Sequence, residues 1–242
     1  MRISVIVPAF NEERLLPESL ARIRAAMQAF ADAGWPSELI VCDNNSTDRT
    51  AEIARTAGAR VVFEPINQIA RARNAGAAQA SGDWLIFVDA DSYPDAALFA
   101  DVAEAIRQGR CIAGGSTVRV ETRNVAARAI VAWWNATSRI ARWAAGAFIF
   151  CEAETFRRIG GFSEEWYAAE EIDLFRRLKR EARRMRRRIV ILHRHPLVTS
   201  ARKARLYTLR ETLRFYVGLF VTRGRALRTP EGTFLWYDGR RE

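Results

Sequence analysis

The sequence has little of what membrane-spanning or disulfide-stapled proteins need. No apolar run in its 242 residues reaches the roughly 18 that cross a bilayer. Its three cysteines, Cys42, Cys111 and Cys151, lie far apart and lack the spacing of a metal site. The N-terminus leads directly into a short apolar segment and does not resemble a signal peptide. We therefore expect a cytoplasmic protein in a reducing compartment.

Acidic residues are also in short supply. The chain has 38 Lys and Arg against 28 Asp and Glu, and a formal net charge of +10. This excess favours anionic partners, namely nucleotides, lipid headgroups or nucleic acid, without choosing among them. A hydrophobic content of 49% supports a sizeable core and excludes wholesale disorder.

Short apolar runs alternate with helical patterns in the first half of the chain. The spacing predicts strands at 3–7, 37–42, 59–63 and 84–88, and helices at 17–30, 50–57 and 68–80. This alternation predicts an α/β fold, with a mostly parallel sheet flanked by helices. Further on, the pattern predicts helices at 125–143, 155–159, 170–187 and 206–220 and strands at 111–121, 144–150 and 189–192.

The strand at 84–88 ends on two carboxylates, Asp89 and Asp91, with only Ala90 between them. Open α/β sheets bind ligands at the carboxyl ends of their strands. Two oxygen donors at this spacing suit a hard divalent cation that also bridges to phosphate. The simpler alternative is that Asp91 or Ser92 caps the helix that starts near Pro94.

Polar groups follow two other strands at the same predicted edge. Asp43 ends the second strand, and its carboxylate can accept the imide N–H of a uracil. Pro8, Ala9 and Glu12 follow the first strand, and Glu12 can take ribose hydroxyls. The alternative for Asp43 is a cap on the next helix.

Three polar residues, Arg71, Arg73 and Asn74, lie on the small-residue helix before the central strand. The arginine fork binds two phosphate oxygens at once, so these arginines are candidate phosphate ligands. A solvated helix face is the alternative.

A second acidic centre opens the helix at 170–187. Glu170, Glu171 and Asp173 follow a glycine- and aromatic-rich loop. Acids at a helix N-terminus complement its dipole, which is one explanation. The other is that one carboxylate points into the crevice and acts as a general base.

Five segments, taken in order, resemble the family-two inverting glycosyltransferases of GT-A fold. They are Val7-Pro8-Ala9-Phe10-Asn11-Glu12-Glu13, Val41-Cys42-Asp43-Asn44-Asn45-Ser46-Thr47-Asp48, Arg73-Asn74-x-Gly76, Asp89-Ala90-Asp91, and Gly160-Gly161-Phe162 before Glu170-Glu171-Ile172-Asp173-Leu174. The resemblance runs from the N-terminus to about residue 180. It implies metal-dependent transfer of a sugar from a nucleotide sugar to an acceptor hydroxyl, with inversion.

The resemblance also implies a role for each matching residue. Glu171 would deprotonate the acceptor, with Glu170 as the fallback because the family usually has Asp at the second position of this pair. Asp89 and Asp91 would hold Mg²⁺ or Mn²⁺. The nucleotide-sugar set would be Pro8, Ala9, Glu12, Asp43, Arg71, Asn74, Asp89 and Ala90. UDP sugars are favoured, because a carboxylate such as Asp43 pairs with the uracil imide, and GDP sugars stay open.

The only two histidines, His193 and His195, follow the strand predicted at 189–192. Some GT-A enzymes place a late histidine on the metal, so this pair resembles that ligand, with His195 preferred. The alternative is a loop histidine that packs on the Arg-rich helix.

The acceptor is expected to be a carbohydrate, a lipid or a small molecule, bound by an acceptor half at 110–200. Residues 1–109 would form the nucleotide half of the same domain, and 201–242 a C-terminal helix and tail. The tryptophans at 133, 134 and 143 suit sugar rings or an isoprenoid tail, or simply pack in the core. The basic helix at 176–188 and the helix at 206–220 are candidates for peripheral contact with the anionic inner face of a membrane.

Two other classes of function stay open. One is a non-catalytic glycosyltransferase-like protein that binds sugar or nucleotide. The other is a basic nucleic-acid-binding module, but the chain lacks aromatic–basic RNA signatures, and no nucleic-acid partner is expected.

Overall fold

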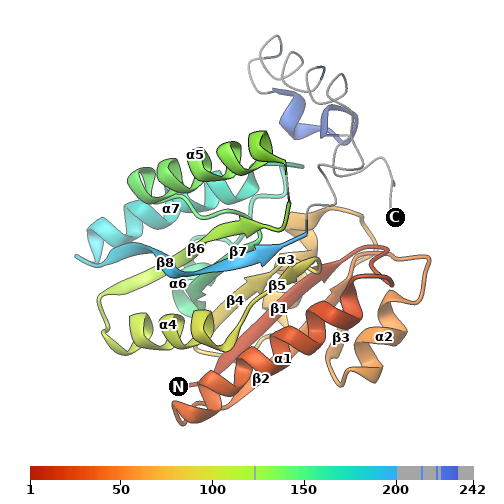
Figure 1. Cartoon of the computed structure of the whole chain (residues 1–242), viewed down its shortest axis with the longest axis horizontal. Helices are drawn as coiled ribbons and strands as arrows, with labels where there is room; N and C mark the ends of the chain where they lie inside the picture. The colour runs from red at the N-terminus through yellow and green to blue at the C-terminus, as the bar shows by residue number, and fades with distance from the viewer. Residues whose placement is uncertain (123, 201–213, 215–221, 223–224, 234–242) are drawn as a thin grey trace.

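A single sheet of eight strands organises the protein (Figure 1). The structure is a computed structural model that describes residues 1–122, 124–200, 214, 222 and 225–233. The strand order across the sheet is β3-β2-β1-β4-β7-β6-β8-β5. In chain order the strands are β1 (Ile3–Ala9), β2 (Ser37–Asp43), β3 (Arg60–Phe63), β4 (Trp84–Val88), β5 (Ser92–Tyr93), β6 (Cys111–Val120), β7 (Phe148–Glu152) and β8 (Arg188–Thr199).

Helices cover both faces of this sheet. The helices α1 and α4 pack on one face, and α3, α6 and α7 pack on the other. The described helices are α1 (Leu16–Asp32), α2 (Thr50–Thr56), α3 (Ile69–Ala78), α4 (Ala96–Arg107), α5 (Val125–Ala141), α6 (Ala153–Arg158) and α7 (Glu170–Arg184), with short 3₁₀ turns η1 (Arg225–Arg228) and η2 (Glu231–Thr233). Among the described residues, no helix combines the length and apolar character that a bilayer-spanning segment needs.

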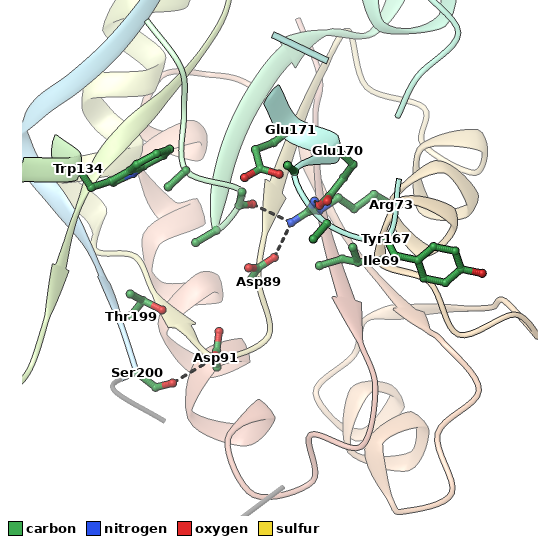
Figure 2. A pocket seen from close by; sticks show the side chains of 15 residues that line it. Ile69, Arg73, Asp89, Asp91, Trp134, Tyr167, Glu170, Glu171, Thr199 and Ser200 are labelled. Carbon is green, nitrogen blue, oxygen red and sulfur yellow. Dashed lines mark hydrogen bonds and ion pairs between the residues drawn. The ribbon is translucent and has the colours of Figure 1, made fainter. Parts of the chain in front are cut away.

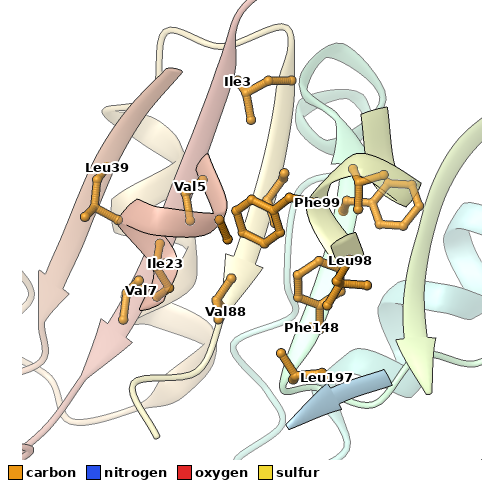
Figure 3. Packing of buried hydrophobic residues seen from close by; sticks show 14 of the residues in the cluster. Ile3, Val5, Val7, Ile23, Leu39, Val88, Leu98, Phe99, Phe148 and Leu197 are labelled. Atoms are coloured by element: carbon orange, nitrogen blue, oxygen red, sulfur yellow. The ribbon is translucent and has the colours of Figure 1, made fainter. Parts of the chain in front are cut away.

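The central strand β4 shows why the sheet is buried on both sides. Trp84, Ile86 and Val88 join the cluster under α1 and α4, which includes Phe99 and Phe148 (Figure 3). The intervening Leu85 and Phe87 join the opposite cluster under α3, α6 and α7. Because successive side chains of a strand alternate in direction, an apolar run fits only a strand covered on both faces.

The fold class predicted from the sequence is confirmed, and the strand boundaries of the first half agree closely. The strands β1, β2, β3 and β4 pair in parallel. One detail is wrong: Pro8 does not end the first strand but lies inside β1, opposite Cys42 of β2. Pairing of β1 with β4 stops at Ile6. Pro8 therefore has a strand on one side only, and its missing N–H breaks no ladder bond on the other.

The second half departs further from expectation. The strand β7 inserts antiparallel between β4 and β6. The strand β8 continues through the two histidines to Thr199, well beyond the predicted end at Leu192, because its pairing with β6 resumes after a bulge and runs to Thr199. The two-residue strand β5 was not predicted. The helix predicted at 206–220 lies outside the described residues, apart from position 214.

Candidate functional site

The carboxyl ends of β1, β2 and β4 lie at one edge of the sheet. Parallel register sets Ala9 beside Asp43, and Asp89 directly follows β4. Asp43 is buried, and its Oδ1 accepts a hydrogen bond from the backbone N–H of Ser46 at 3.1 Å. It does not cap α2, whose N-cap position is Arg49, so that alternative is wrong. The bond shapes the loop after β2 instead.

A pocket of about 330 Å³ opens next to β4 (Figure 2). This volume lies within the range of small-molecule sites. Asp89 and Asp91 line it from the loop after β4, and Glu170 and Glu171 line it from the start of α7. The lining residues are Ile69, Arg73, Asp89, Asp91, Trp134, Ala145, Gly146, Ala147, Tyr167, Ala168, Ala169, Glu170, Glu171, Thr199 and Ser200.

Arg73 is the hub of this pocket. Its guanidinium, 1% exposed, donates to Asp89 Oδ1 at 2.9 Å, to the Gly146 carbonyl at 2.9 Å and to Glu170 Oε1. Burial alone would lower the pKa of Arg73, but Asp89 and Glu170 raise it above its ordinary value, so the side chain stays charged. The alternative of a solvated helix face is therefore wrong for Arg73, whereas its role as a phosphate ligand stays a prediction, since the residue lines the pocket.

Asp91 faces the same pocket from the loop after β4 (Figure 2). Its Oδ2 accepts from the Ser200 hydroxyl at 3.0 Å, and its carbonyl accepts from the Ser200 N–H at 3.0 Å. The helix α4 is capped by Asp95, whose carboxylate accepts from Leu98 N at 2.7 Å. The alternative that Asp91 or Ser92 caps this helix is thus wrong.

The paired acids at the start of α7 have different surroundings. Glu170 is 4% exposed and is committed to Arg73. Glu171 lines the pocket, and burial together with the neighbouring Glu170 charge raises its pKa to about 8. The preceding Ala169 has φ 63°, a left-handed conformation that residues with a Cβ rarely adopt. Such strain is often found at functional sites, and here it sets the direction in which the two carboxylates leave the chain.

Asn74 and Arg71 hold loops rather than line the pocket. Asn74 donates to the Phe162 carbonyl at 2.9 Å and accepts from the Phe162 N–H at 2.9 Å. A Cβ at Gly161, which has φ 65°, would come within 2.6 Å of Asn74 Oδ1, so this contact requires glycine. Arg71 pairs with Glu64 at 3.2 Å and also with Glu164. The direct contacts predicted for Asn74 and Arg71 with a nucleotide sugar therefore have no support in this geometry.

The remaining members of the predicted nucleotide set also lie outside the pocket lining. Pro8 and Ala9 are buried in β1, and Ala90 is buried between the two acids. Glu12 is buried, and its N–H donates to Thr50 Oγ1 at 2.8 Å. Of that set, Asp89 alone lines the pocket.

The two histidines lie elsewhere, on β8. His195 Nδ1 is 3.0 Å from Asp101 Oδ2 of α4, and neither His193 nor His195 lines the pocket. Within the described part of the chain, no group of three or more His, Cys, Asp or Glu side chains could hold a metal. The expectation that a histidine joins Asp91 fails because β8 extends as a strand where a loop was expected.

Sequence reasoning missed the closing side of the pocket. Ser200 and Thr199 arrive there only because β8 is long. The small-residue segment before β7 was read as strand, yet Gly146 lies so close that a Cβ would sit 3.3 Å from Arg73 Nη2 and 3.6 Å from Glu171 Cδ. A run of Ala and Gly between α5 and β7 is the one signal that could have indicated this close approach.

Two solved structures of similar fold hold sugar nucleotides. The mannosyltransferase PcManGT from Pyrobaculum calidifontis, solved with GDP-Man and Mn²⁺, matches with TM-score 0.68 and 19% identity over 99% of this chain and 65% of that chain. Glucosyl-3-phosphoglycerate synthase from Mycobacterium tuberculosis, solved with Mn²⁺ and UDP-Glc, matches with TM-score 0.60 and 22% identity over 91% of this chain and 78% of that chain. At these identities the likeness establishes the fold.

Relatives in sequence carry transferase names. Dolichol-phosphate mannosyltransferase of Pyrococcus furiosus is 34% identical over 48% of this chain and 33% of its own length. Undecaprenyl-phosphate 4-deoxy-4-formamido-L-arabinose transferase of Pseudomonas aeruginosa is 33% identical over 52% of this chain and 38% of its own length. The chain thus spans little more than a third of these relatives. The model of Glycosyl transferase family 2 matches residues 4–164. With the fold and the order of motifs described above, this match shows that the chain belongs to glycosyl transferase family 2.

Proposed function

We propose that this protein transfers a sugar from a nucleoside-diphosphate sugar to an acceptor hydroxyl, with a divalent cation bound and with inversion at the anomeric carbon. The observation that carries the proposal is the convergence of Asp89, Asp91 and Glu171 on one pocket at the carboxyl edge of the sheet. A sheet edge is the usual ligand position in open α/β folds. Residues 1–109 form the proposed nucleotide half and 110–200 the acceptor half.

The donor atoms present fit a cation such as Mn²⁺ or Mg²⁺. Asp89 and Asp91 both bring carboxylate oxygens to the pocket, and such oxygens are the hard donors that these cations prefer. Cations of this type are commonly held by one or two carboxylates together with substrate phosphates, which suits the pair Asp89 and Asp91 that the described residues bring to this pocket. When bound, the cation supplies positive charge that stabilises the departing diphosphate.

Glu171 is the proposed general base. It takes the proton from the acceptor hydroxyl as that oxygen bonds to the anomeric carbon, and the bond from this carbon to the diphosphate oxygen breaks on the opposite face. A base works best when its pKa lies near the working pH, and burial raises the pKa of Glu171 to about 8 in the free protein. Glu170 is the weaker candidate, because its carboxylate is held by Arg73.

We propose the identity of the nucleobase and of the acceptor less specifically than the reaction itself. Asp43 and Glu12 lie at the ends of β2 and β1, where a uracil and its ribose would be read, so UDP sugars are our first choice and GDP sugars the second. The acceptor class stays broad: a carbohydrate, a small molecule or a lipid. The two relatives named for dolichol and undecaprenyl phosphates keep the lipid in this set.

A thermal-shift panel of UDP and GDP sugars, each with Mn²⁺ or with EDTA, tests the proposal. A ligand that binds the folded state raises the melting temperature by mass action, so a UDP sugar with Mn²⁺ should give the largest rise. Sugar-nucleotide turnover measured on the same samples separates an enzyme from a non-catalytic binder. No rise with any sugar nucleotide, together with no turnover, would contradict the proposal.

A further inference from the structure

The outer face of α5 is apolar and uncovered among the described residues. Residues spaced three, four and seven apart put Val125, Ala129, Ala132, Trp133, Ala136 and Ile140 on one side of the helix. Val125 is 75% exposed, Trp133 69% and Ile140 86%. Figure 1 shows α5 at the outer margin of the fold. We call these six residues the α5 outer face.

The opposite side of α5 packs against the rest of the protein. The exposed apolar side is therefore not the side through which this helix joins the core. The Asn135 side chain accepts from Val118 N at 3.0 Å and donates to Val118 O at 2.8 Å, which fixes the helix to β6. Trp134 lines the pocket and packs on the main apolar cluster. The helix is therefore anchored by one side while its other side presents large apolar groups to the surroundings.

Positive charge borders the α5 outer face, and negative charge is missing from it. No acidic residue occurs between Glu121 and Glu152, whereas Arg128, Arg139 and Arg142 do. The exposed Arg176 and Arg183 lie about one turn to either side of Lys179 on α7. Lys179 itself donates to the Ala141 carbonyl at the end of α5.

We propose that the α5 outer face docks on an anionic lipid bilayer. Trp133, Ile140 and Val125 enter the boundary between headgroups and acyl chains, and the bordering arginines meet lipid phosphates. An amphipathic helix with an aromatic and aliphatic face edged by basic residues is the kind of element that lies in a membrane interface. A second copy of this surface fits less well, because it would set cationic rims against each other.

Docking in this orientation has a geometric consequence for the site. Trp133 and Trp134 are adjacent on the helix, and Trp134 lines the pocket. The pocket would then lie on the side of α5 that faces away from the lipid, one helix diameter (~10 Å) from the docked face. The inference goes beyond the proposed function and does not depend on it, since binding to lipid requires neither the cation nor Glu171.

Co-sedimentation with vesicles tests the proposal, using the full chain and vesicles of phosphatidylcholine with or without phosphatidylglycerol. We expect binding to the anionic vesicles at low salt, weakened by high salt. The double variant Trp133→Ser/Ile140→Ser should lower the partition coefficient by about tenfold or more. The matched control is Phe63→Ser/Ile66→Ser, which removes two exposed apolar side chains, 60% and 48% exposed, from the far edge of the sheet.

A second pair of variants tests the charged border. Arg128→Gln/Arg139→Gln should lower binding to anionic vesicles by about tenfold, whereas Arg14→Gln/Arg55→Gln removes the same charge from exposed positions elsewhere and should have little effect. Melting temperatures should be unchanged in all four, because the substituted side chains are exposed.

Three outcomes would overturn the proposal. They are no binding of the parent protein to anionic vesicles at low salt, equal losses in the control and α5 variants, and a concentration-dependent dimer that Trp133→Ser/Ile140→Ser abolishes without any vesicle binding. The last would assign this surface to a second copy of the chain.

Discussion

The two halves of the molecule treat their loops differently. In the proposed nucleotide half, residues 1–109, polar bonds hold the loops after the strands: Asn44 Nδ2 donates to the carbonyls of Glu64 and Ile66, and its Oδ1 accepts from Gln68 N at 2.8 Å. In the acceptor half, β6 and β8 pair through two register shifts, and α5 leaves its apolar face uncovered among the described residues. The loops of the first half are thus held by internal hydrogen bonds, whereas the second half has an apolar surface that a binding partner could cover.

This difference matches the two tasks that we propose. A donor site that binds the same nucleotide at every turnover gains from loops held in advance, because less freedom is lost on binding. An acceptor site must also admit a second molecule, and an exposed apolar surface beside it is available for binding. Arg73 joins the halves, since it lies on α3 and its guanidinium bonds both Asp89 and, across the pocket, Glu170 and Gly146.

The sharpest test of the division of labour is Glu171→Gln. If the acceptor half supplies the base, sugar transfer should fall by roughly 10²–10⁴-fold, the usual contribution of a general base. Binding of the nucleotide sugar with Mn²⁺, followed by thermal shift, should persist because the donor half is intact. Glu165→Gln, on the exposed loop before α7, is the control and should keep full turnover. Near-normal transfer by Glu171→Gln would remove this residue from the proposed mechanism.

Breaking the link between the halves should affect stability most. Arg73→Met leaves Glu170 buried without its cation, and losing one partner of a buried ion pair costs about 3–5 kcal/mol. The free energy of unfolding from urea titration measures this loss. The double variant Arg73→Met/Glu170→Leu removes both charges and should recover much of it. If the single variant matches the parent in stability, Arg73 is not the hub that the contacts indicate.

The proposed metal site should depend on Asp91 and not on the histidines. Asp91→Asn should raise the Mn²⁺ concentration needed for the half-maximal thermal shift with a nucleotide sugar by about tenfold or more, because a neutral amide is a weaker ligand for a hard cation. His195→Ala should leave that concentration unchanged, since His195 pairs with Asp101 away from the pocket. An equal rise in His195→Ala would restore the histidine to the site.

The contrast between the two halves also explains which elements could be predicted from the sequence. Strands β1 to β4 are short, apolar and punctuated by helices, so local pattern alone identifies them and the acids at their ends. The extent of β8 and the position of β7 depend on pairing with strands far along the chain, which no local pattern encodes. That is why His195 was expected near Asp91 and Ser200 was not.

The residues of the candidate site also divide into those with a local sequence signal and those that depend on distant contacts. Asp89, Asp91 and Glu171 stand out from sequence because acids that end a strand or open a helix next to glycines are locally unusual. Arg73 lies on a helix of small residues and looks like any surface arginine. Its partner Glu170 is 97 residues away, so its burial becomes visible only in the folded chain.

The last effect that we expect is a pH-dependent one on stability, again at Glu171. Its folded pKa of about 8 lies above the ordinary value of 4.5, because burial and Glu170 disfavour the charged form. Between these two values the folded state binds more protons than the unfolded state, so the free energy of unfolding falls as the pH rises. Glu171→Gln removes that penalty. In EDTA, its melting temperature should match the parent near pH 4 and exceed it at pH 8 and above, with the gap opening between these two values. Glu165→Gln should show no such trend. A difference between Glu171→Gln and the parent that is constant across this pH range would mean that Glu171 is already charged in the folded protein, which would place it in a wetter pocket than its contacts imply.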